Sequence, residues 1–299
     1  MTKPFSERPS ILLVGATGRV GRLLRHHWPA GPSAPQLLSV RRRAEAGAGN
    51  GLVWSPLDGP QALLRNPTHP PPVALVMMAG VTPGPAVDDA ALAVNRTLAE
   101  ACLDAARQAG IGRVLLASSA AVYGLDSNGL ALDETAPTAP ISAYGRAKLD
   151  MEAAAAPARD AGLNVSVLRI GNVAGADALL GPLTGLHPDH HPPLRIDAFA
   201  DGLGPLRSYI GAASLARVLA TLSCLPGPVP DVLNIAAPDP VRMTALAKAA
   251  GWPFLLTPAP AHARQVVTLD CRRLHAICPE PPFENLPETM VQNWKESWH

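Results

Sequence analysis

The feature that most constrains the fold is a glycine-rich turn directly after an apolar run near the start of the chain. The stretch ILLVGATGRVG (residues 11–21) places glycines at positions 15, 18 and 21. Gly15 permits a tight turn, Gly18 lets the backbone approach a pyrophosphate, and Gly21 allows a helix to pack closely on the strand. The start of that helix would face the anion, so the stretch predicts a dinucleotide-binding strand–turn–helix.

Short apolar runs and longer helical patterns alternate through the first 171 residues. The expected strands are residues 11–14, 36–40, 52–54, 73–78, 114–118 and 164–170. The expected helices are residues 19–28, 59–66, 87–109 and 141–156, and we expect Pro157 to end the last of them. Strands that alternate with helices indicate βαβ units, and therefore an α/β fold with a Rossmann-type doubly wound parallel sheet.

The pattern loosens after residue 171. A segment rich in Gly, Pro and His runs to about residue 206, followed by helices near 212–222 and 243–250, strands near 232–235 and 266–269, and a terminal helix. We therefore predict a dinucleotide-binding domain over residues 1–171 and a small α/β substrate lobe over 172–299, with strands and helices that return to the Rossmann core. Such a lobe would pack over the carboxyl ends of the strands, where open α/β sheets bind ligands.

The composition excludes several classes of protein. The formal net charge is +1, so no global field favours nucleic acid or an anionic membrane. No apolar run approaches the roughly 18 residues of a membrane span, and no secretory signal is visible. Four cysteines lie far apart, and the histidines near His187 and His191 predict a surface loop able to close over a substrate rather than a metal site. We expect a cytoplasmic enzyme without a metal.

A tyrosine and a lysine stand four residues apart in SAYGRAKLD, at the start of a predicted helix. This spacing puts Tyr144 and Lys148 on one helical face. An ammonium group close to a phenol favours the phenolate, so the pair is suited to proton transfer. The plain alternative is an ordinary exposed Tyr/Lys pair.

Two serines stand at the end of the predicted strand in LLASSAAVYG (residues 115–124). A hydroxyl of Ser118 or Ser119 at this place can hold a substrate oxygen beside the tyrosine. The alternative is that they cap a turn.

The three motifs in this order resemble the short-chain dehydrogenase/reductase superfamily, specifically its extended branch, the NAD-dependent epimerase/dehydratase family. The resemblance covers nearly the whole chain, through GATGRVG, VNRTLAEACLDAARQAGIGRVLLASSAAVYG, SAYGRAKLDME, LRIGNVAG and LRSYIGAASLARVL. It implies a Rossmann fold, a nicotinamide cofactor and a homodimer formed by the helices at 87–109 and 141–156.

The resemblance also implies roles for individual residues. Tyr144 would be the catalytic acid or base, Lys148 would bind the nicotinamide ribose and lower the pKa of Tyr144, and Ser119 would be the catalytic hydroxyl. The other implied cofactor residues are Gly15, Thr17, Gly18, Arg19, Val20, Ala79, Gly80, Asn95, Ser118 and Ile170. The implied substrate residues, beside Ser119 and Tyr144, are Val81, Thr82, Asn172 and Arg207.

Two departures from the family pattern narrow the chemistry. Family dehydratases carry an Asp-Glu pair after the catalytic hydroxyl, whereas this chain has Ala120 and Ala121, so we do not expect dehydration. The family's Arg-Asp-Tyr-Ile-His run reads RSYIG here (residues 207–211), without the acid and the histidine. A substrate smaller than a nucleotide sugar is therefore plausible.

Three arginines (Arg41, Arg42 and Arg43) follow the second predicted strand, where an acidic residue would bind the adenosine ribose of NAD. A guanidinium suits a 2′-phosphate, and each charge-assisted contact contributes ~1.5–3 kcal/mol. Arg41 is the leading contact and Arg42 the alternative, so the pattern favours NADP over NAD. The other interpretation is a solvated basic turn.

These residues predict hydride transfer between a nicotinamide and a secondary alcohol or ketone of a sugar-like or other small substrate. The same residues serve a nucleotide-sugar epimerase that keeps NAD tightly bound, which is the main alternative. A catalytically silent cofactor sensor is the third reading. Such relatives usually lose the tyrosine or the lysine, and this chain has both.

Overall fold

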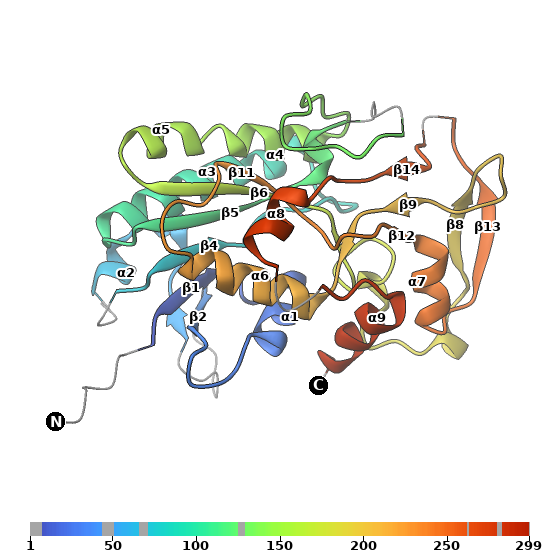
Figure 1. The fold of residues 1–299 in the computed structure, drawn as a ribbon, viewed down its shortest axis with the longest axis horizontal. Coiled ribbons are helices and arrows are strands. Elements are labelled where there is room, and N and C mark those ends of the chain that lie inside the picture. The colour runs from blue at the N-terminus through green and yellow to red at the C-terminus, as the bar shows by residue number, and fades with distance from the viewer. Residues whose placement is uncertain are drawn as a thin grey trace.

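The computed structural model describes residues 8–43, 51–65, 71–124, 129–261, 263–279 and 283–298. A sheet of seven strands lies at its centre, in the order β3-β2-β1-β4-β5-β6-β11 (Figure 1). These strands are β1 (Ser10–Val14), β2 (Gln36–Arg41), β3 (Leu52–Val53), β4 (Ala74–Met77), β5 (Arg113–Ser119), β6 (Asn164–Ile170) and β11 (Val232–Ile235). Every neighbouring pair runs parallel, which confirms the predicted doubly wound sheet.

The direction of winding reverses between β1 and β4, which lie side by side although β2 and β3 separate them in sequence. Val14 pairs with Met77 at the carboxyl ends of these strands. The glycine-rich turn and the segment after β4 therefore emerge next to each other. This reversal is the place where open α/β sheets bind ligands.

Helices cover both faces of the sheet (Figure 1). Those packed around it are α1 (Arg19–His27), α2 (Gln61–Arg65), α3 (Asp89–Gln108), α4 (Ala143–Glu152), α5 (Ala155–Asp160) and α6 (Ala212–Cys224). Along β1, Ile11 and Leu13 face the core with α1 and α6, whereas Leu12 and Val14 face the core with α3, α4 and α5. A strand buried on both faces in this way reads as a continuous apolar run.

Side-chain caps set where two helices begin. The Asp88 carboxylate accepts a hydrogen bond from Ala91 N at 2.8 Å, so α3 starts two residues later than expected. Ser142 caps α4 in the same way. The prediction that Pro157 ends this helix is wrong. α4 ends at Glu152, and Pro157 lies in the first turn of α5, where a missing N–H costs no hydrogen bond.

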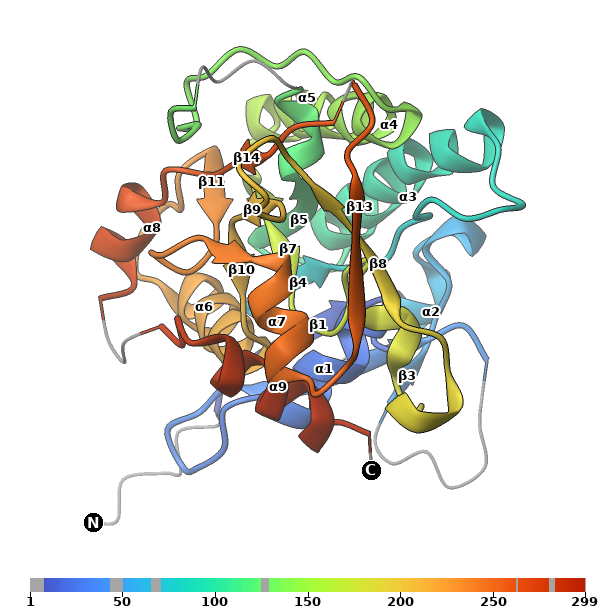
Figure 2. The same cartoon turned by 90° about the vertical axis from the view of Figure 1, so that its right-hand side faces the viewer.

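The chain beyond β6 contributes α6 and β11 to the Rossmann core and builds a lobe from three small sheets, β10-β7, β12-β9-β14 and β13-β8. In Figure 2, β8, β13 and α7 lie in front of the central sheet. The strands are β7 (Asn172–Val173), β8 (Leu194–Ala198), β9 (Leu206–Arg207), β10 (Tyr209–Ile210), β12 (Val241–Arg242), β13 (Phe254–Pro258) and β14 (Val266–Val267). The helices are α7 (Met243–Ala249), α8 (Arg272–Ile277) and α9 (Pro287–Glu296). Short 3-10 turns are η1 (Pro56–Asp58), η2 (Ala120–Val122), η3 (Gly181–Leu183) and η4 (Pro188–His190).

A buried arginine joins the amino end of the sheet to a helix. Arg113, the first residue of β5, donates hydrogen bonds to Leu222 O at 2.8 Å, Ser223 O at 2.9 Å and Leu225 O at 2.8 Å. It thereby satisfies carbonyls at the end of α6 that have no partner within the helix. Burial lowers the pKa of this guanidinium.

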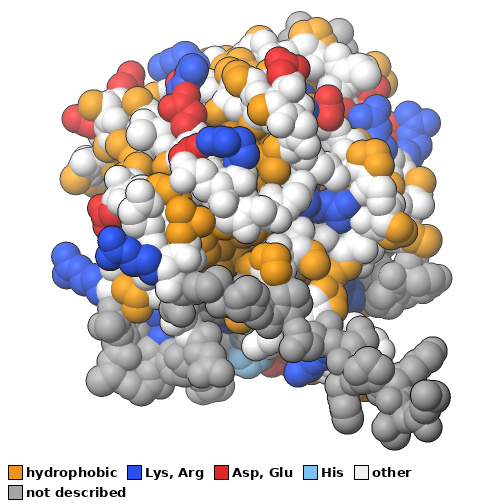
Figure 3. Space-filling view, turned by 90° about the vertical axis from the view of Figure 1, so that its left-hand side faces the viewer, with side chains coloured by type: hydrophobic (Ala, Val, Ile, Leu, Met, Phe, Trp, Pro, Cys, Tyr) orange, Lys and Arg blue, Asp and Glu red, His pale blue; other side chains and the backbone are white. Residues whose placement is uncertain are grey.

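Two features concern the partners that the sequence leads us to expect: the charges on the surface and the apolar character of the helices. The face seen from the left of Figure 1 intersperses acidic, basic and hydrophobic side chains (Figure 3). Among the described helices, none has both the length and the apolar character that a membrane crossing needs.

Candidate active site

The glycine-rich turn forms an open cradle between β1 and α1. Gly15 has φ +95°, which side chains rarely adopt, and a Cβ there would collide with the backbone of Ala79. Gly18 is the N-cap of α1, and no side chain among the described residues caps that helix end by a hydrogen bond. The first backbone N–H groups of α1 are therefore suited to bind a pyrophosphate. These features fit a dinucleotide cofactor.

An asparagine from α3 clamps the segment that follows β4. Val81 N donates to Asn95 Oδ1 at 2.7 Å, and Asn95 Nδ2 donates back to Val81 O at 3.0 Å. A Cβ on Gly80 would lie 2.7 Å from Asn95 Oδ1 and 3.4 Å from Lys148 Nζ. Gly80 is therefore the point where the segment after β4 comes close to both α3 and α4.

The structure brings Ser119, Tyr144 and Lys148 together at the carboxyl end of β5. The Ser119 hydroxyl lies close enough to the Tyr144 phenol to lower its pKa, and it accepts a hydrogen bond from Ala121 N at 3.2 Å. The ammonium of Lys148 lies 5.9 Å from the centroid of the Tyr144 ring and donates to Ala117 O at 2.8 Å. The spacing of four residues therefore does place both side chains on the face of α4 that packs on β5.

Burial governs the protonation of both groups. It raises the pKa of the Tyr144 phenol, which the nearby Ser119 hydroxyl opposes. It lowers the pKa of Lys148 to about 8, which the charge of Glu152 opposes. In this structure the ammonium is directed at a backbone carbonyl, and desolvation outweighs any lowering of the Tyr144 pKa by Lys148.

The two neighbouring serines point in different directions, because successive side chains of a strand face opposite sides. Ser119 contacts Tyr144, whereas Ser118 donates to Glu152 Oε1 at 2.6 Å. Ser118 is 5% exposed, and the carboxylate that its hydroxyl contacts forms a buried ion pair with Arg169. Ser118 therefore contacts α4 in this structure, and its assignment to the cofactor side stays a prediction.

The other residues predicted to bind the cofactor follow β1 or end β6. Thr17 and Arg19 are exposed beside the cradle, and Val20 is half-buried in the first turn of α1. Arg19 Nη1 reaches toward η3, 3.3 Å from the place of a Cβ on Gly181. Ile170 is buried at the end of β6, where the chain enters the lobe.

The arginine row begins on β2 itself. Arg41 is the last residue of the strand and is half-buried, with its guanidinium beside Gly51, whereas Arg42 and Arg43 are exposed. Residues 44–50 lie outside the described residues.

The expected substrate residues lie on different elements of the lobe and its entrance. Asn172 is half-buried on β7, Thr82 is exposed after β4, and Arg207 is on β9. The Arg207 guanidinium donates to Gln265 O and to Arg264 O, each at 2.7 Å. These backbone carbonyls engage the donors of a side chain that the family resemblance assigns to the substrate.

The histidine-rich segment forms the exposed turn η4, in which His187 Nδ1 lies 3.5 Å from Asp189 Oδ2. A different group among the described residues has the composition of a metal site. His26 and His27 at the end of α1 bring ligand atoms within 4.8 Å of each other and of Glu296 on α9. His27 Nε2 already hydrogen-bonds with Asn293 O at 2.7 Å.

Two functional candidates were missed at the level of sequence. Glu152 continues the spacing of Tyr144 and Lys148 by one more helical turn, and Arg169 is a charge within the apolar run NVSVLRI. A cation in a strand that is buried on both faces needs a partner. That requirement was the available signal for the Glu152–Arg169 pair.

The fold and the site together define a dinucleotide-binding α/β protein with a serine, a tyrosine and a lysine at the carboxyl ends of its strands. Residues 11–212 match the model of the NAD dependent epimerase/dehydratase family. The chain belongs to this family.

Two relatives illustrate the range of similar sequences. A UDP-glucose 4-epimerase of Azospirillum brasilense is 35% identical over 188 residues, which cover 59% of this chain and 53% of that protein. A dTDP-6-deoxy-L-talose 4-dehydrogenase (NAD(P)(+)) of Kitasatospora kifunensis is 29% identical over 180 residues, covering 59% and 56%. The chain thus spans about half the length of the relatives it matches.

Solved structures resemble the fold over almost its whole length. A UDP-glucose-4-epimerase from Stenotrophomonas maltophila with bound NAD and formylated UDP-arabinopyranose has a TM-score of 0.77 at 20% identity, covering 97% of this chain and 98% of that one. A short-chain dehydrogenase/reductase superfamily protein from Agrobacterium tumefaciens with bound NAD has a TM-score of 0.75 at 20% identity, covering 96% of each chain.

Proposed function

We propose that the protein is an NAD(P)-dependent oxidoreductase that transfers hydride between a nicotinamide and a secondary alcohol or its ketone on a sugar-like or other small molecule. The observation that carries this proposal is the meeting of Ser119, Tyr144 and Lys148 beside Gly80, next to the cradle of α1. A proton donor, a hydroxyl and a cation stand together there.

Each residue has a separate task in this reaction. A bound nicotinamide dinucleotide supplies the hydride or accepts it. The N-terminus of α1 would hold the pyrophosphate of the cofactor, and Asn95 fixes the segment after β4 through Val81. The hydroxyl of Ser119 holds the substrate oxygen, and Tyr144 Oη gives the proton to that oxygen in reduction or takes it in oxidation. The Lys148 ammonium stabilises negative charge on Tyr144 Oη.

The cofactor we favour is NADP, bound through Arg41 with Arg42 as the alternative contact. The position of Arg41 at the end of β2 supports this assignment, because the adenosine ribose of a Rossmann cofactor lies at the end of that strand. The neighbours with bound NAD favour the other cofactor, and the experiment below separates the two.

A nucleotide-sugar epimerase with tightly held NAD is the second candidate. The 35% identity to a UDP-glucose 4-epimerase favours it. The engagement of Arg207 by backbone carbonyls favours the first, since a diphosphate or base would have to displace those contacts. In either reaction we assign Val81, Thr82 and Asn172 to the substrate side, and we propose a homodimer in the cytoplasm that pairs through α3 and α4.

Calorimetry with NADPH and NADH tests the cofactor assignment. We expect the wild type to bind NADPH about tenfold tighter or more, and Arg41→Ala to remove that preference. Arg43→Ala, an exposed neighbour with the same change of charge, is the matched control. Equal binding of NADH, or NAD that stays bound through purification, would contradict the NADP assignment and favour the epimerase.

A second measurement tests the reaction itself. Absorbance at the nicotinamide band, with a set of small ketones and with nucleotide sugars, identifies a substrate of the wild type. Loss of substrate-dependent oxidation of the cofactor in Tyr144→Phe, with cofactor binding retained, supports the assigned proton donor. A chain that binds neither dinucleotide would overturn the proposed function.

A further inference from the structure

Behind the catalytic lysine lies a buried ion pair that the reaction described above does not use. The Arg169 side chain, on β6, donates to Glu152 Oε2 through Nη2 at 2.8 Å and to Glu152 Oε1 through Nε at 3.1 Å. The two side chains are 8% and 9% exposed. Ser118 adds a third hydrogen bond to Glu152 at 2.6 Å. Glu152 is therefore an ionised carboxylate with fixed position rather than a mobile surface acid.

Glu152 stands one helical turn beyond Lys148 on the same face of α4. The two side chains contact consecutive residues of β5, because Lys148 donates to Ala117 O and Glu152 accepts from Ser118. The Lys148 side chain is as buried as the pair, at 5% residue exposure. Lys148, Glu152 and Arg169 thus form one buried cluster of three charged side chains. The net charge of the cluster is +1 when Lys148 is protonated.

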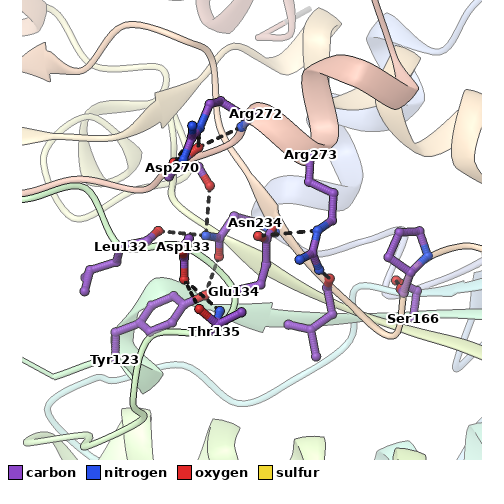
Figure 4. A network of polar contacts seen from close by, with 12 residues as sticks. Tyr123, Leu132, Asp133, Glu134, Thr135, Ser166, Asn234, Asp270, Arg272 and Arg273 are labelled. Carbon is purple, nitrogen blue, oxygen red and sulfur yellow. Dashed lines mark hydrogen bonds and ion pairs between the residues drawn. The ribbon is translucent and has the colours of Figure 1, made fainter.

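Arg169 is held in place from its other side as well. Its guanidinium lies 4.7 Å from the centroid of the Tyr123 ring, and Tyr123 Oη donates to Asn234 Oδ1 at 2.6 Å. Asn234 in turn donates to Leu132 O and Asp270 O (Figure 4). This polar network fixes the distance between the guanidinium and α4.

We propose that Glu152 is a positioning residue which keeps Lys148 protonated by cancelling the field of Arg169. The reasoning rests on the difference between the two cations. An arginine stays charged in any protein environment, whereas a buried lysine gives up its proton readily. If the Glu152 charge is removed, the cluster keeps two buried cations, Arg169 on the strand that pairs with β5 at Ser118 and Lys148 at Ala117 O, and Lys148 is the one that becomes neutral. This inference depends on the proposed function only for its consequence, which is that Tyr144 would lose its cationic neighbour.

The elements around Lys148 add few other titratable groups among the described residues. Tyr144 shares its helix, Tyr123 lies on the far side of Arg169, and α3 contributes the uncharged Asn95. The charged Arg96 of α3 pairs with Asp150 on the exposed face of α4. Burial lowers the pKa of Lys148 to about 8, and the Glu152 charge is the opposing influence. Glu152 is thus the acidic group that acts on this lysine.

The chain offers a direct measurement, because it contains only four lysines, Lys3, Lys148, Lys248 and Lys295. Protein labelled with ¹³C-lysine gives one Cε resonance for each, and Lys148→Met identifies the signal of Lys148. A pH titration of that signal reports its protonation without any substrate. The variants are Glu152→Gln, which removes the charge and keeps the shape, and Glu152→Asp, which keeps the charge. Glu100→Gln is the matched control, since Glu100 is an exposed helix glutamate paired with Arg96.

We expect Glu152→Gln to lower the midpoint of Lys148 by about one pH unit or more, Glu152→Asp to restore most of it, and Glu100→Gln to leave it unchanged. The double variant Glu152→Gln with Arg169→Met removes both charges and should return the midpoint close to that of the wild type. It also provides a folded protein if the single variant fails to fold, because a buried ion pair replaced as a whole is often tolerated.

A residue that merely ties α4 to β6 would change the stability without moving the titration of Lys148. An unchanged midpoint in folded Glu152→Gln, or a double variant whose midpoint falls further, would overturn the proposal. Binding of NADPH and NADH is measured on the same samples. If the wild type binds neither dinucleotide, the proposed function is refuted, whereas the titration of Lys148 still tests the role of Glu152.

Discussion

The two ends of the central sheet each bury an arginine, and the hydrogen-bond donors of the two side chains are satisfied in different ways. Arg113, at the amino end of β5, is surrounded by backbone carbonyls at the end of α6. Arg169, near the carboxyl end of β6, faces the carboxylate of Glu152. Carbonyls satisfy hydrogen bonds and add no charge, whereas a carboxylate also cancels a field.

In the proposal above, this difference separates a contact that holds the fold from a contact that also acts on Lys148. At the amino end, the hydrogen bonds of Arg113 join a strand to a helix and end there. At the carboxyl end, Glu152 of the pair lies one helical turn from Lys148, and in the proposal above a change of the pair's charge alters the protonation of that lysine. Substitutions at the two ends should therefore change different quantities.

The largest effect is expected from Tyr144→Phe, at the carboxyl end. Removal of a general acid or base costs about 10²- to 10⁴-fold in rate. We expect the turnover of a ketone or alcohol that the wild type accepts to fall within that range, with the free energy of unfolding and the affinity for the cofactor nearly unchanged. A variant that keeps more than a tenth of the wild-type turnover would show that another group transfers the proton.

Arg113→Met tests the opposite end. It leaves the carbonyls of Leu222, Ser223 and Leu225 without their donor, which should lower the free energy of unfolding by about 3 kcal/mol. Urea denaturation measures this loss. Cofactor affinity of the folded variant should equal that of the wild type, and a parallel loss of affinity would mean that the two ends are not independent.

The pH dependence of stability sharpens the comparison further. The folded-state pKa of Lys148 is about 8, below the usual value of 10.5, so the native protein binds fewer protons than the unfolded chain between these values. Unfolding free energy contributed by this group therefore rises as the pH rises from 8 to 10.5, by roughly 2–3 kcal/mol. Lys148→Met should be more stable than the wild type at pH 7, with an advantage that shrinks across this interval. The exposed Lys248→Met should show no such trend.

The smallest effect is expected from Arg207→Met. This partly buried side chain donates to the carbonyls of Arg264 and Gln265, so its loss should cost about 1–2 kcal/mol of unfolding free energy. If the residue acts on the fold of the lobe alone, KM for the substrate changes little. A large rise of KM at constant stability would instead assign Arg207 to the substrate, as the family resemblance implies.

Local signals made much of the site predictable. The glycines of the cradle and the spacing of Tyr144 and Lys148 each depend on short stretches of chain, and a helix places residues four apart on one face whatever surrounds it. The opposite orientations of Ser118 and Ser119 follow from the alternation of side chains along a strand. Arg169 and Glu152 are 17 residues apart in sequence, and only the packing of α4 on the sheet brings them together.

The lobe was the part that sequence patterns described least well. The strands β8 and β13 pair with each other although 55 residues separate their ends, and β13 exposes Leu255 and Leu256. A pair of strands with so few buried side chains has no strong period of two. The return of β11 to the main sheet has a clearer pattern, because Leu233 and Ile235 are fully buried.

The place of β11 in the sheet limits how this protein can be divided. The match to the family model ends at residue 212, whereas β11, which pairs with β6, begins at Val232. A fragment cut at the end of the matched region would present β6 as an unpaired apolar edge, a form of strand that adds to other chains and aggregates. A chimera in which the lobe is exchanged between relatives must therefore keep β11 together with the core strand that it pairs with. The reason is that the match to the family model ends before β11 completes the central sheet.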